Sequence, residues 1–380
     1  MFSLIDIPYI QFLEIEPTTF CNAGCPLCSR HKPGTSDLID DLVLEHLPKS
    51  ILEKLRDELN QYQTAKEVGI FYCGNYGDAI MHPDFEWLWW YSAQYFKSVG
   101  VHTNGGARSI DFWKYLGDIS KPNEWGHSNA AVTFAIDGLK DTNHLYRRNV
   151  NWEKLISNVE AYINAGGTAN WKYIVFNHNK HQVDEARELA RKLGFQNFTA
   201  EVSTRQPPIE KEKEEAKKVA KKLPSVEIKR VAELEDHMIK NIDRSVKSKD
   251  IIKTEENKKF AVVENFTDDN DCISCRGIAT HNMFINPKGR IWPCCFLSEE
   301  WDTNISQLHR AEPWLVEHYE ADFNNLHRKS LKEIFDAPAW KEISEAWSTK
   351  KHKLYTCWKK CKNSRWKVSN TMIQSTDHFK

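Results

Sequence analysis

Six short β-rich runs alternate with longer amphipathic runs between residues 10 and 204 of this 380-residue chain, and this rhythm limits the possible folds. The short runs are rich in β-branched and aromatic residues, whereas the longer runs space their apolar residues as helices do. We therefore predict an α/β fold with strands over residues 10–16, 67–73, 98–103, 131–137, 170–177 and 197–203. The predicted helices cover residues 42–60, 83–97, 109–119, 151–166 and 182–194.

Six strands joined by right-handed crossovers form either part of a barrel or an open sheet, and periodicity does not choose between them. In both arrangements, functional side chains gather at the carboxyl ends of the strands.

Beyond residue 204 the composition changes twice. Residues 205–270 are dense in Lys and Glu, which is typical of a charged helical connector, and residues 271–380 are rich in Cys and Trp. This gives three predicted parts: 1–204, 205–270 and 271–380.

The last part contains two recognisable local patterns. Residues 282–294 read as a β-hairpin around the turn at Pro287-Lys288-Gly289. Residues 330–347 carry apolar residues at helical spacing, which predicts a single helix that packs against a core.

Charge and hydropathy exclude several classes of protein. The net charge of −1 argues against general affinity for nucleic acid or anionic membranes. The N-terminal residues lack the basic and apolar parts of a secretory signal, and no apolar run reaches the ~20 residues of a membrane span. We therefore expect a soluble cytoplasmic protein. In a reducing compartment, its ten cysteines favour metal ligation or thiol chemistry over disulfides.

Cys21, Cys25 and Cys28 follow the first predicted strand with the spacing C-x3-C-x2-C. Three thiolates on a short loop can bind three corners of an iron–sulfur cube, which leaves the fourth iron open to a substrate or cofactor. A structural zinc site is the alternative interpretation. Neither His31 nor Cys73 completes a common zinc spacing with the triplet.

This triplet, placed after the first strand of a βα array, resembles the radical S-adenosylmethionine (radical SAM) superfamily. The resemblance covers residues 10–204 and implies a partial (β/α)6 TIM-like barrel. It implies that the three cysteines hold a catalytic 4Fe–4S cluster and that SAM chelates the open iron through its amino and carboxylate groups. Reduction, implied to come from a flavodoxin- or ferredoxin-type protein, would cleave SAM to methionine and a 5′-deoxyadenosyl radical that abstracts a hydrogen atom from a substrate.

Two further motifs resemble parts of the family's SAM pocket. YGDAIMHPDF (76–85) resembles the GGEP-LLHPDF stretch, whose backbone pairs with the SAM amino group. It departs from that pattern because Gly77-Asp78-Ala79 stands in place of Gly-Glu-Pro, and Leu27 is a second departure at a position that is usually aromatic. HTNGG (102–106) resembles the family's TTNG.

The fourth and fifth strands end in the remaining pocket motifs. FAIDGLKDTNHLYRR (134–148) resembles a segment in which the Arg after Tyr commonly meets the SAM carboxylate, which places this role on Arg147, with Arg148 as the fallback. Asn177 matches an Asn that often lies near the ribose and methionine part of SAM. The SAM-binding residues that the resemblance implies are Tyr76, Gly77, Asp78, Ala79, Thr103, Asn104, Asp137, Arg147 and Asn177.

The second cysteine cluster reads Cys275-x13-Gly289-x4-Cys294, followed downstream by Cys357-x3-Cys361. It resembles the opening of the SPASM and twitch extensions of radical SAM enzymes. Because only two cysteines follow Cys295, the shorter twitch form, a β-hairpin plus helix, fits better. It implies one auxiliary 4Fe–4S cluster, saturated by four thiolates and suited to electron transfer or structure. The implied ligands are Cys275, Cys294, Cys357 and Cys361.

Two alternatives for this cluster stay open. Cys272 or Cys295 replaces one of the four implied ligands, or a zinc ribbon uses Cys272, Cys275 and Cys294 with Cys357 or Cys361. Cys73, within the second predicted strand, reads as a buried apolar residue.

Relatives with SPASM or twitch extensions modify peptides and proteins or oxidise small molecules. The resemblance therefore implies a radical SAM oxidoreductase or modifying enzyme, and we favour a peptide or protein side chain as its substrate. A nucleotide or RNA is the alternative substrate, supported by the basic, Trp-containing segment 358–367. A non-enzymatic zinc or iron–sulfur protein is the alternative of another class. No general acid or base can be assigned to a residue.

Overall fold

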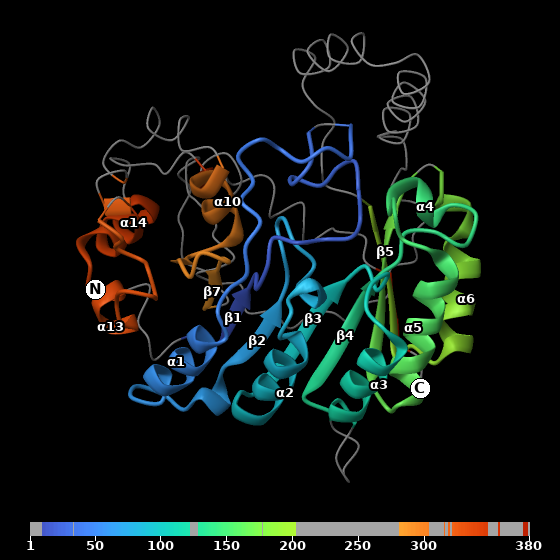
Figure 1. The fold of residues 1–380 in the computed structure, drawn as a ribbon, viewed down its shortest axis with the longest axis horizontal. Helices are drawn as coiled ribbons and strands as arrows, with labels where there is room; N and C mark the ends of the chain where they lie inside the picture. Colours follow the sequence, from blue (N-terminus) through green and yellow to red (C-terminus); the bar gives the residue numbers. More distant parts are fainter. Residues whose placement is uncertain are drawn as a thin grey trace. The chain divides into compact units, whose positions relative to one another are not determined.

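The computed structural model describes residues 10–32, 34–121, 128–176, 178–202, 281–303, 315, 318–319, 321–348, 356–357 and 375–378 (Figure 1). The predicted connector, and with it Asn177, Cys272, Cys275 and Cys361, lies outside these residues. The chain divides into two compact units. The first unit comprises residues 1–20, 43–101 and 255–371, and the second comprises 21–42, 102–254 and 372–380.

The first unit contains the strand order β8-β7-β1-β2-β3. Here β1 (Phe12–Ile15) lies between β2 (Gly69–Tyr72) and β7 (Asn282–Ile285), and both neighbours run parallel to it. The predicted hairpin is present, because β8 (Ile291–Trp292) pairs antiparallel with β7. The parallel pairing of β7 with β1, which puts the C-terminal segment into the same sheet as the N-terminal strands, was not predicted.

The second unit contains the order β4-β5-β6-β9. Its strands β4, β5 and β6 run parallel, and β9 pairs antiparallel with β6. The buried ring of Phe134 on β4 contacts Trp113 and Tyr162 from two helices, with centroid distances of 5.2 and 5.9 Å. The strands are β3 (Ser98–Thr103, which begins in the first unit), β4 (Ala130–Ala135), β5 (Thr168–Val175), β6 (Asn197–Val202) and β9 (Ser375–His378).

All six predicted barrel strands are therefore confirmed, and each observed strand overlaps its predicted range. Within the described residues the strands do not close into a complete barrel, since β8 and β9 each pair on one side only. The fold is α/β with a partial barrel of parallel strands, as predicted.

Local sequence signals explain where the long helices start and stop. The side chains of Ser109 and Asn151 accept backbone N–H groups from the first turns of α3 and α5. Gly194, at φ 88°, ends α6 in the left-handed conformation that glycine tolerates best. The long helices are α1 (Ser50–Leu59), α2 (Phe85–Tyr95), α3 (Ile110–Ile119), α5 (Trp152–Asn164) and α6 (Val183–Leu193); the shorter ones include α4 (Asn143–Tyr146) and α10 (Cys295–Thr303).

Two predicted helices are corrected by the structure. The helix predicted over 42–60 begins only at Ser50, because the preceding segment runs extended beside the chain that follows β1, with the Leu47 N–H donating to the Pro17 carbonyl at 2.8 Å. The helix predicted over 330–347 is two helices, α13 (Leu331–Phe335) and α14 (Pro338–Ser348). Pro338 lacks an N–H group and disfavours helical geometry at the residue before it, so the chain restarts there.

No helix in the described ranges is both long and apolar enough to cross a membrane.

Candidate active site

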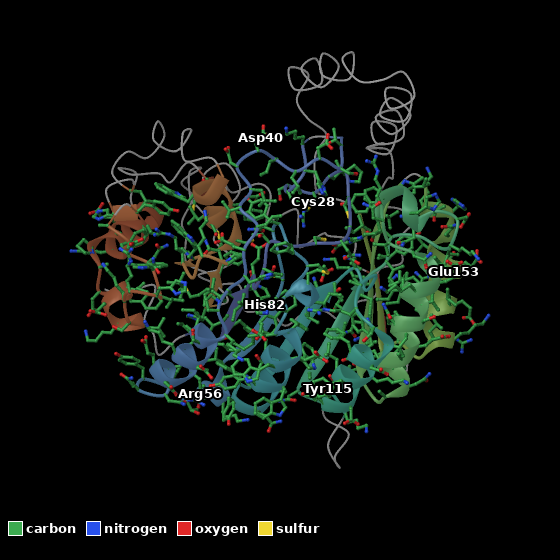
Figure 2. The ribbon with its side chains drawn as sticks, viewed as in Figure 1. Cys28, Asp40, Arg56, His82, Tyr115 and Glu153 are labelled. Atoms are coloured by element: carbon green, nitrogen blue, oxygen red, sulfur yellow. The ribbon has the colours of Figure 1, made fainter. Side chains whose placement is uncertain are left out.

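The three N-terminal cysteines lie in the second unit on one tightly folded loop, where Figure 2 labels Cys28. The Cys28 N–H donates to the Cys25 carbonyl at 3.1 Å, and the His31 N–H donates to the Cys28 carbonyl at 3.0 Å. Cys25 is buried, whereas Cys21 and Cys28 are partly exposed. The two successive turns keep the cysteines within one short, compact segment.

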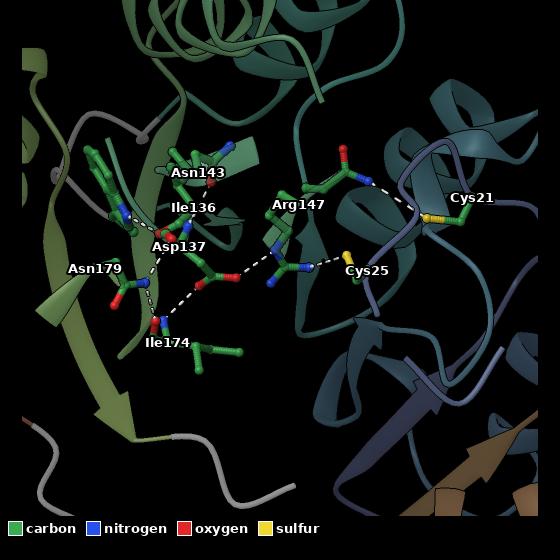
Figure 3. A network of polar contacts seen from close by, with 10 residues as sticks. Cys21, Cys25, Ile136, Asp137, Asn143, Arg147, Ile174 and Asn179 are labelled. Atoms are coloured by element: carbon green, nitrogen blue, oxygen red, sulfur yellow. Dashed lines mark hydrogen bonds and ion pairs between the residues drawn. The ribbon is translucent and has the colours of Figure 1, made fainter. Parts of the chain in front are cut away.

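Polar donors from the same unit reach two of the thiols (Figure 3). The Asn104 amide nitrogen lies 3.8 Å from Cys21 Sγ, and the Ala23 N–H donates to the same sulfur at 3.4 Å. A guanidinium nitrogen of Arg147 lies 3.8 Å from Cys25 Sγ. Burial raises the pKa of the Cys25 thiol, and the Arg147 charge opposes that rise. N–H groups and cations stabilise thiolate, which is the form that binds metal.

Within the described ranges, no three His, Cys, Asp or Glu side chains are gathered closely enough to hold one metal ion. The chemistry of the donor set still fits a 4Fe–4S cube, because three thiols share one short loop and two of them receive N–H or guanidinium donors. His31 is directed at the backbone, since its Nδ1 lies 2.9 Å from the Cys25 carbonyl oxygen. Burial also lowers the pKa of His31.

Arg147 is held by a buried carboxylate at the end of β4. Its Nε lies 2.6 Å from Asp137 Oδ2, and Asp137 Oδ1 accepts the Ile174 N–H at 2.7 Å. Burial raises the pKa of Asp137, and Arg147 opposes this shift. Burial works against the Arg147 cation too, but the charges of Asp137 and Cys25 outweigh it, so the pKa of Arg147 lies above its ordinary value. The fallback residue, Arg148, donates instead to Ser36 Oγ at 3.0 Å.

A buried asparagine that was not predicted ties the ends of β4 and β5 together. Asn179 is fully buried, and its amide nitrogen donates to the carbonyls of Asp137 and Ile174 at 2.8 and 2.9 Å. Its Oδ1 accepts the Phe176 N–H at 2.7 Å. The prediction for Asn177 falls outside the described residues. An Asn in the turn after a strand is the sequence signal that could have identified Asn179.

The TNG motif after β3 serves both the turn and the cysteine loop. Thr103 Oγ1 accepts the Gly105 N–H at 3.0 Å, and Asn104 Oδ1 accepts the Gly106 N–H at 2.8 Å. Gly105 has φ +68°, a conformation that favours glycine. The Asn104 amide nitrogen also donates to Asn22 Oδ1 at 2.9 Å, so Asn104 contacts the loop that carries Cys21.

The remaining predicted SAM-binding residues, Tyr76 to Ala79, lie in the first unit on the loop after β2. A Cβ atom on Gly77 would stand 1.7 Å from the Thr18 carbonyl oxygen, so only glycine fits there. The Asp78 N–H donates to the Phe20 carbonyl at 2.9 Å, and the Asp78 side chain caps the short helix Ala79–Met81. Glu16, which was not predicted, accepts the N–H groups of Tyr76 and Gly77.

Replacement of Gly77 by Ala tests this close approach. We expect the free energy of unfolding to fall by about 3 kcal/mol in urea titrations, because the backbone at Thr18 has to move. Gly34→Ala is the control for the added methyl group: a Cβ on Gly34 meets nothing within 4 Å, although the φ of Gly34, +76°, favours glycine. That variant should lose only about 1 kcal/mol. Equal losses in the two variants would contradict the packing argument.

The second group of cysteines is only partly described. Cys294 follows β8 and is partly exposed, and Cys357 is buried. Cys73, directly after β2, and Cys295, at the start of α10, lie within electrostatic range of each other and of Glu14. Burial raises the pKa of Cys73 well above its ordinary value and that of Cys295 to about 12.

Comparisons with known proteins match both the C-terminal segment and the fold. Residues 275–363 match the SPASM family, described as an iron-sulfur cluster-binding domain. The crystal structure of Streptococcus suis SuiB bound to S-adenosylmethionine matches with a TM-score of 0.50 and 14% sequence identity, covering 88% of this chain. The chain therefore has the same α/β partial-barrel fold as this structure, and the segment that matches the SPASM family lies toward its C-terminal end. The chain spans 66% of the length of SuiB.

Two further structures show the same fold. SuiB bound to the precursor peptide SuiA matches with a TM-score of 0.50 and 13% identity, over 88% of this chain and 66% of SuiB. Histidine-tagged anSMEcpe with bound AdoMet matches with a TM-score of 0.50 and 14% identity, over 92% of this chain and 84% of that protein. No curated protein sequence matches the chain.

Proposed function

We propose that this chain is a radical SAM enzyme that abstracts a hydrogen atom from a peptide or protein side chain. The observation that carries the proposal is the placement of Arg147, whose guanidinium contacts both Cys25 Sγ and the Asp137 carboxylate. The cation proposed for the SAM carboxylate thus lies beside a thiol of the proposed cluster loop. When bound and reduced, the 4Fe–4S cluster would supply the electron that cleaves SAM to methionine and a 5′-deoxyadenosyl radical.

In this proposal Cys21, Cys25 and Cys28 hold the catalytic cluster, and the residues around them bind and orient SAM. Arg147 pairs with the SAM carboxylate, which a planar guanidinium recognises well. Asp137 orients Arg147, and Asn143 supports Asp137 by accepting its N–H at 2.9 Å. The other proposed SAM-binding residues are Tyr76, Gly77, Asp78, Ala79, Thr103, Asn104 and Asn177.

The auxiliary cluster is proposed to be a single 4Fe–4S cube on Cys275, Cys294, Cys357 and Cys361. It would exchange electrons with the substrate, and a flavodoxin- or ferredoxin-type protein would reduce the catalytic cluster. Residues 1–204, 205–270 and 271–380 would then form the barrel, the connector and the auxiliary-cluster domain. We place the enzyme in the cytoplasm.

Replacing Cys294 by Ser tests the auxiliary ligands. We expect the bound iron to fall from about eight to about four atoms per chain, while the electron paramagnetic resonance signal that SAM perturbs persists. Cys295→Ser is the matched control at the next position and should keep all the iron. The reverse pattern, with iron lost from Cys295→Ser and kept in Cys294→Ser, would assign the ligand to Cys295 instead.

Two observations support a peptide as the substrate. The SuiB structure that matches this fold holds a precursor peptide, and the net charge of −1 offers little general attraction for nucleic acid. The test compares 5′-deoxyadenosine formation with a pool of synthetic peptides that presents all twenty side chains and with a pool of transfer RNA and nucleosides. We expect the peptide pool alone to stimulate formation. Stimulation by the RNA and nucleoside pool alone would favour the nucleotide alternative.

A further inference from the structure

Glu16 is a buried carboxylate in the first unit that accepts hydrogen bonds from the backbone of the loop after β2. It lies just beyond the carboxyl end of β1 and is 1% exposed. One of its oxygens, Oε1, accepts the N–H groups of Tyr76 and Gly77 at 2.7 and 2.9 Å. The Glu16 N–H donates in turn to the Ile285 carbonyl at 2.8 Å. The backbone of β7 therefore holds Glu16 in place, and Glu16 holds the loop after β2.

Because the peptide bond is planar, the hydrogen bonds to Glu16 also determine where the carbonyl groups of the same peptides point. The described part of the chain contains no cis peptide bonds, and in a trans peptide the C=O and N–H groups point in opposite directions. The N–H groups of Tyr76 and Gly77 share their peptide planes with the carbonyls of Asn75 and Tyr76. Since both N–H groups point at Glu16, both of these carbonyl oxygens point away from it.

The charge on Glu16 also changes the strength of these carbonyls as acceptors. A hydrogen bond to a carboxylate is charge-assisted, and hydrogen bonds in series polarise one another. The Asn75 and Tyr76 carbonyl oxygens therefore carry more negative charge than those of a loop held by neutral partners. Both oxygens lie on the side of the loop opposite Glu16, where they are acceptors for a cation with several N–H donors.

The loop is also fixed on a second side, by α10. The Asn75 side-chain nitrogen donates to the Cys295 carbonyl at 3.0 Å, and the Tyr76 hydroxyl donates to the Glu299 carbonyl at 3.3 Å. Gly77 is packed against Thr18, as described above. The two carbonyls are therefore presented from a loop whose orientation is set before any ligand arrives.

We propose that Glu16 is a positioning residue that aims and polarises the Asn75 and Tyr76 carbonyl oxygens for the α-ammonium group of SAM. This inference rests on the proposed function, because it requires that SAM binds at this loop. Glu16 itself does not touch SAM. It acts through the two peptide groups.

The test measures the binding of two ligands to the reconstituted enzyme by equilibrium dialysis: SAM, and 5′-methylthioadenosine, which lacks the amino-acid part. Glu16→Gln keeps the size and an acceptor oxygen but removes the charge. We expect the Kd for SAM to rise about tenfold, because the two carbonyl oxygens would be weaker acceptors for the ammonium group, and the Kd for methylthioadenosine to stay unchanged. Glu14→Gln, which removes a carboxylate from β1 two residues before Glu16, is the matched control and should leave SAM binding unchanged.

Three outcomes separate the possibilities. Unchanged SAM binding by Glu16→Gln would overturn the inference, as would an equal loss for both ligands, which marks a merely structural role. A wild-type enzyme that holds its clusters but does not bind SAM would overturn the proposed function itself. If Glu16→Gln does not bind its iron, Glu16→Asp serves in its place: it keeps the charge on a shorter side chain, and the loss of affinity should again be confined to SAM.

Discussion

Replacement of Cys25 by Ala is expected to abolish 5′-deoxyadenosine formation and to remove about four of about eight iron atoms per chain. Cys25 is the buried member of the triplet and the one that Arg147 contacts. Without it, the catalytic cube would keep only two protein ligands. The measurements are iron analysis after anaerobic reconstitution and chromatography of the SAM cleavage products.

Cys73→Ala is the control for that variant, since Cys73 is also a partly buried cysteine but lies on the loop after β2. It should keep all the iron and form 5′-deoxyadenosine at the wild-type rate. If Cys25→Ala keeps its iron and its SAM cleavage, the N-terminal triplet does not hold the catalytic cluster.

Replacement of Asp137 by Ala is expected to lower both stability and SAM affinity. Asp137 is fully buried and accepts from Arg147 and from the Ile174 N–H, so its loss leaves a largely buried guanidinium without its carboxylate. Breaking a buried ion pair from one side costs about 3–5 kcal/mol. Urea unfolding measures this loss. Because Arg147 would no longer be oriented, equilibrium dialysis should show weaker SAM binding as well.

Two matched variants separate charge from shape at this site. Asp137→Asn keeps an oxygen for the Ile174 N–H, so it should lose less stability than Asp137→Ala while still weakening SAM binding. Asp118→Ala breaks an exposed ion pair with Lys121 at the end of α3, and it should change stability by less than about 1 kcal/mol. Wild-type SAM affinity in Asp137→Asn would show that Asp137 does not orient Arg147 for SAM.

Local patterns were sufficient to predict the six barrel strands, because the β-branched and aromatic runs of the strands and the apolar spacing of the helices are properties of neighbouring residues. The Pro338 break was readable from the sequence, but helical spacing on both sides of it led to the prediction of one helix. The pairing of β7 with β1 could not be predicted from local sequence patterns. A hairpin pattern predicts the antiparallel partner of β7, whereas its parallel partner depends on packing across most of the chain.

The residues of the candidate site also differ in whether local sequence patterns could identify them. The spacing of the cysteine triplet is local and visible, and the choice between Arg147 and Arg148 needed three-dimensional contacts, because adjacent arginines look alike in a sequence. Glu16 and Asn179 were missed. Their partners are backbone groups of distant segments or of a turn, and no residue pattern shows which N–H or carbonyl a side chain will reach.

The most direct test of the proposed radical SAM activity is anaerobic reconstitution with iron and sulfide, followed by reduction with dithionite in the presence of SAM. We expect about eight iron atoms per chain and the formation of 5′-deoxyadenosine and methionine. A protein that retains zinc in place of iron, or that binds iron but leaves SAM intact under reduction, would contradict it.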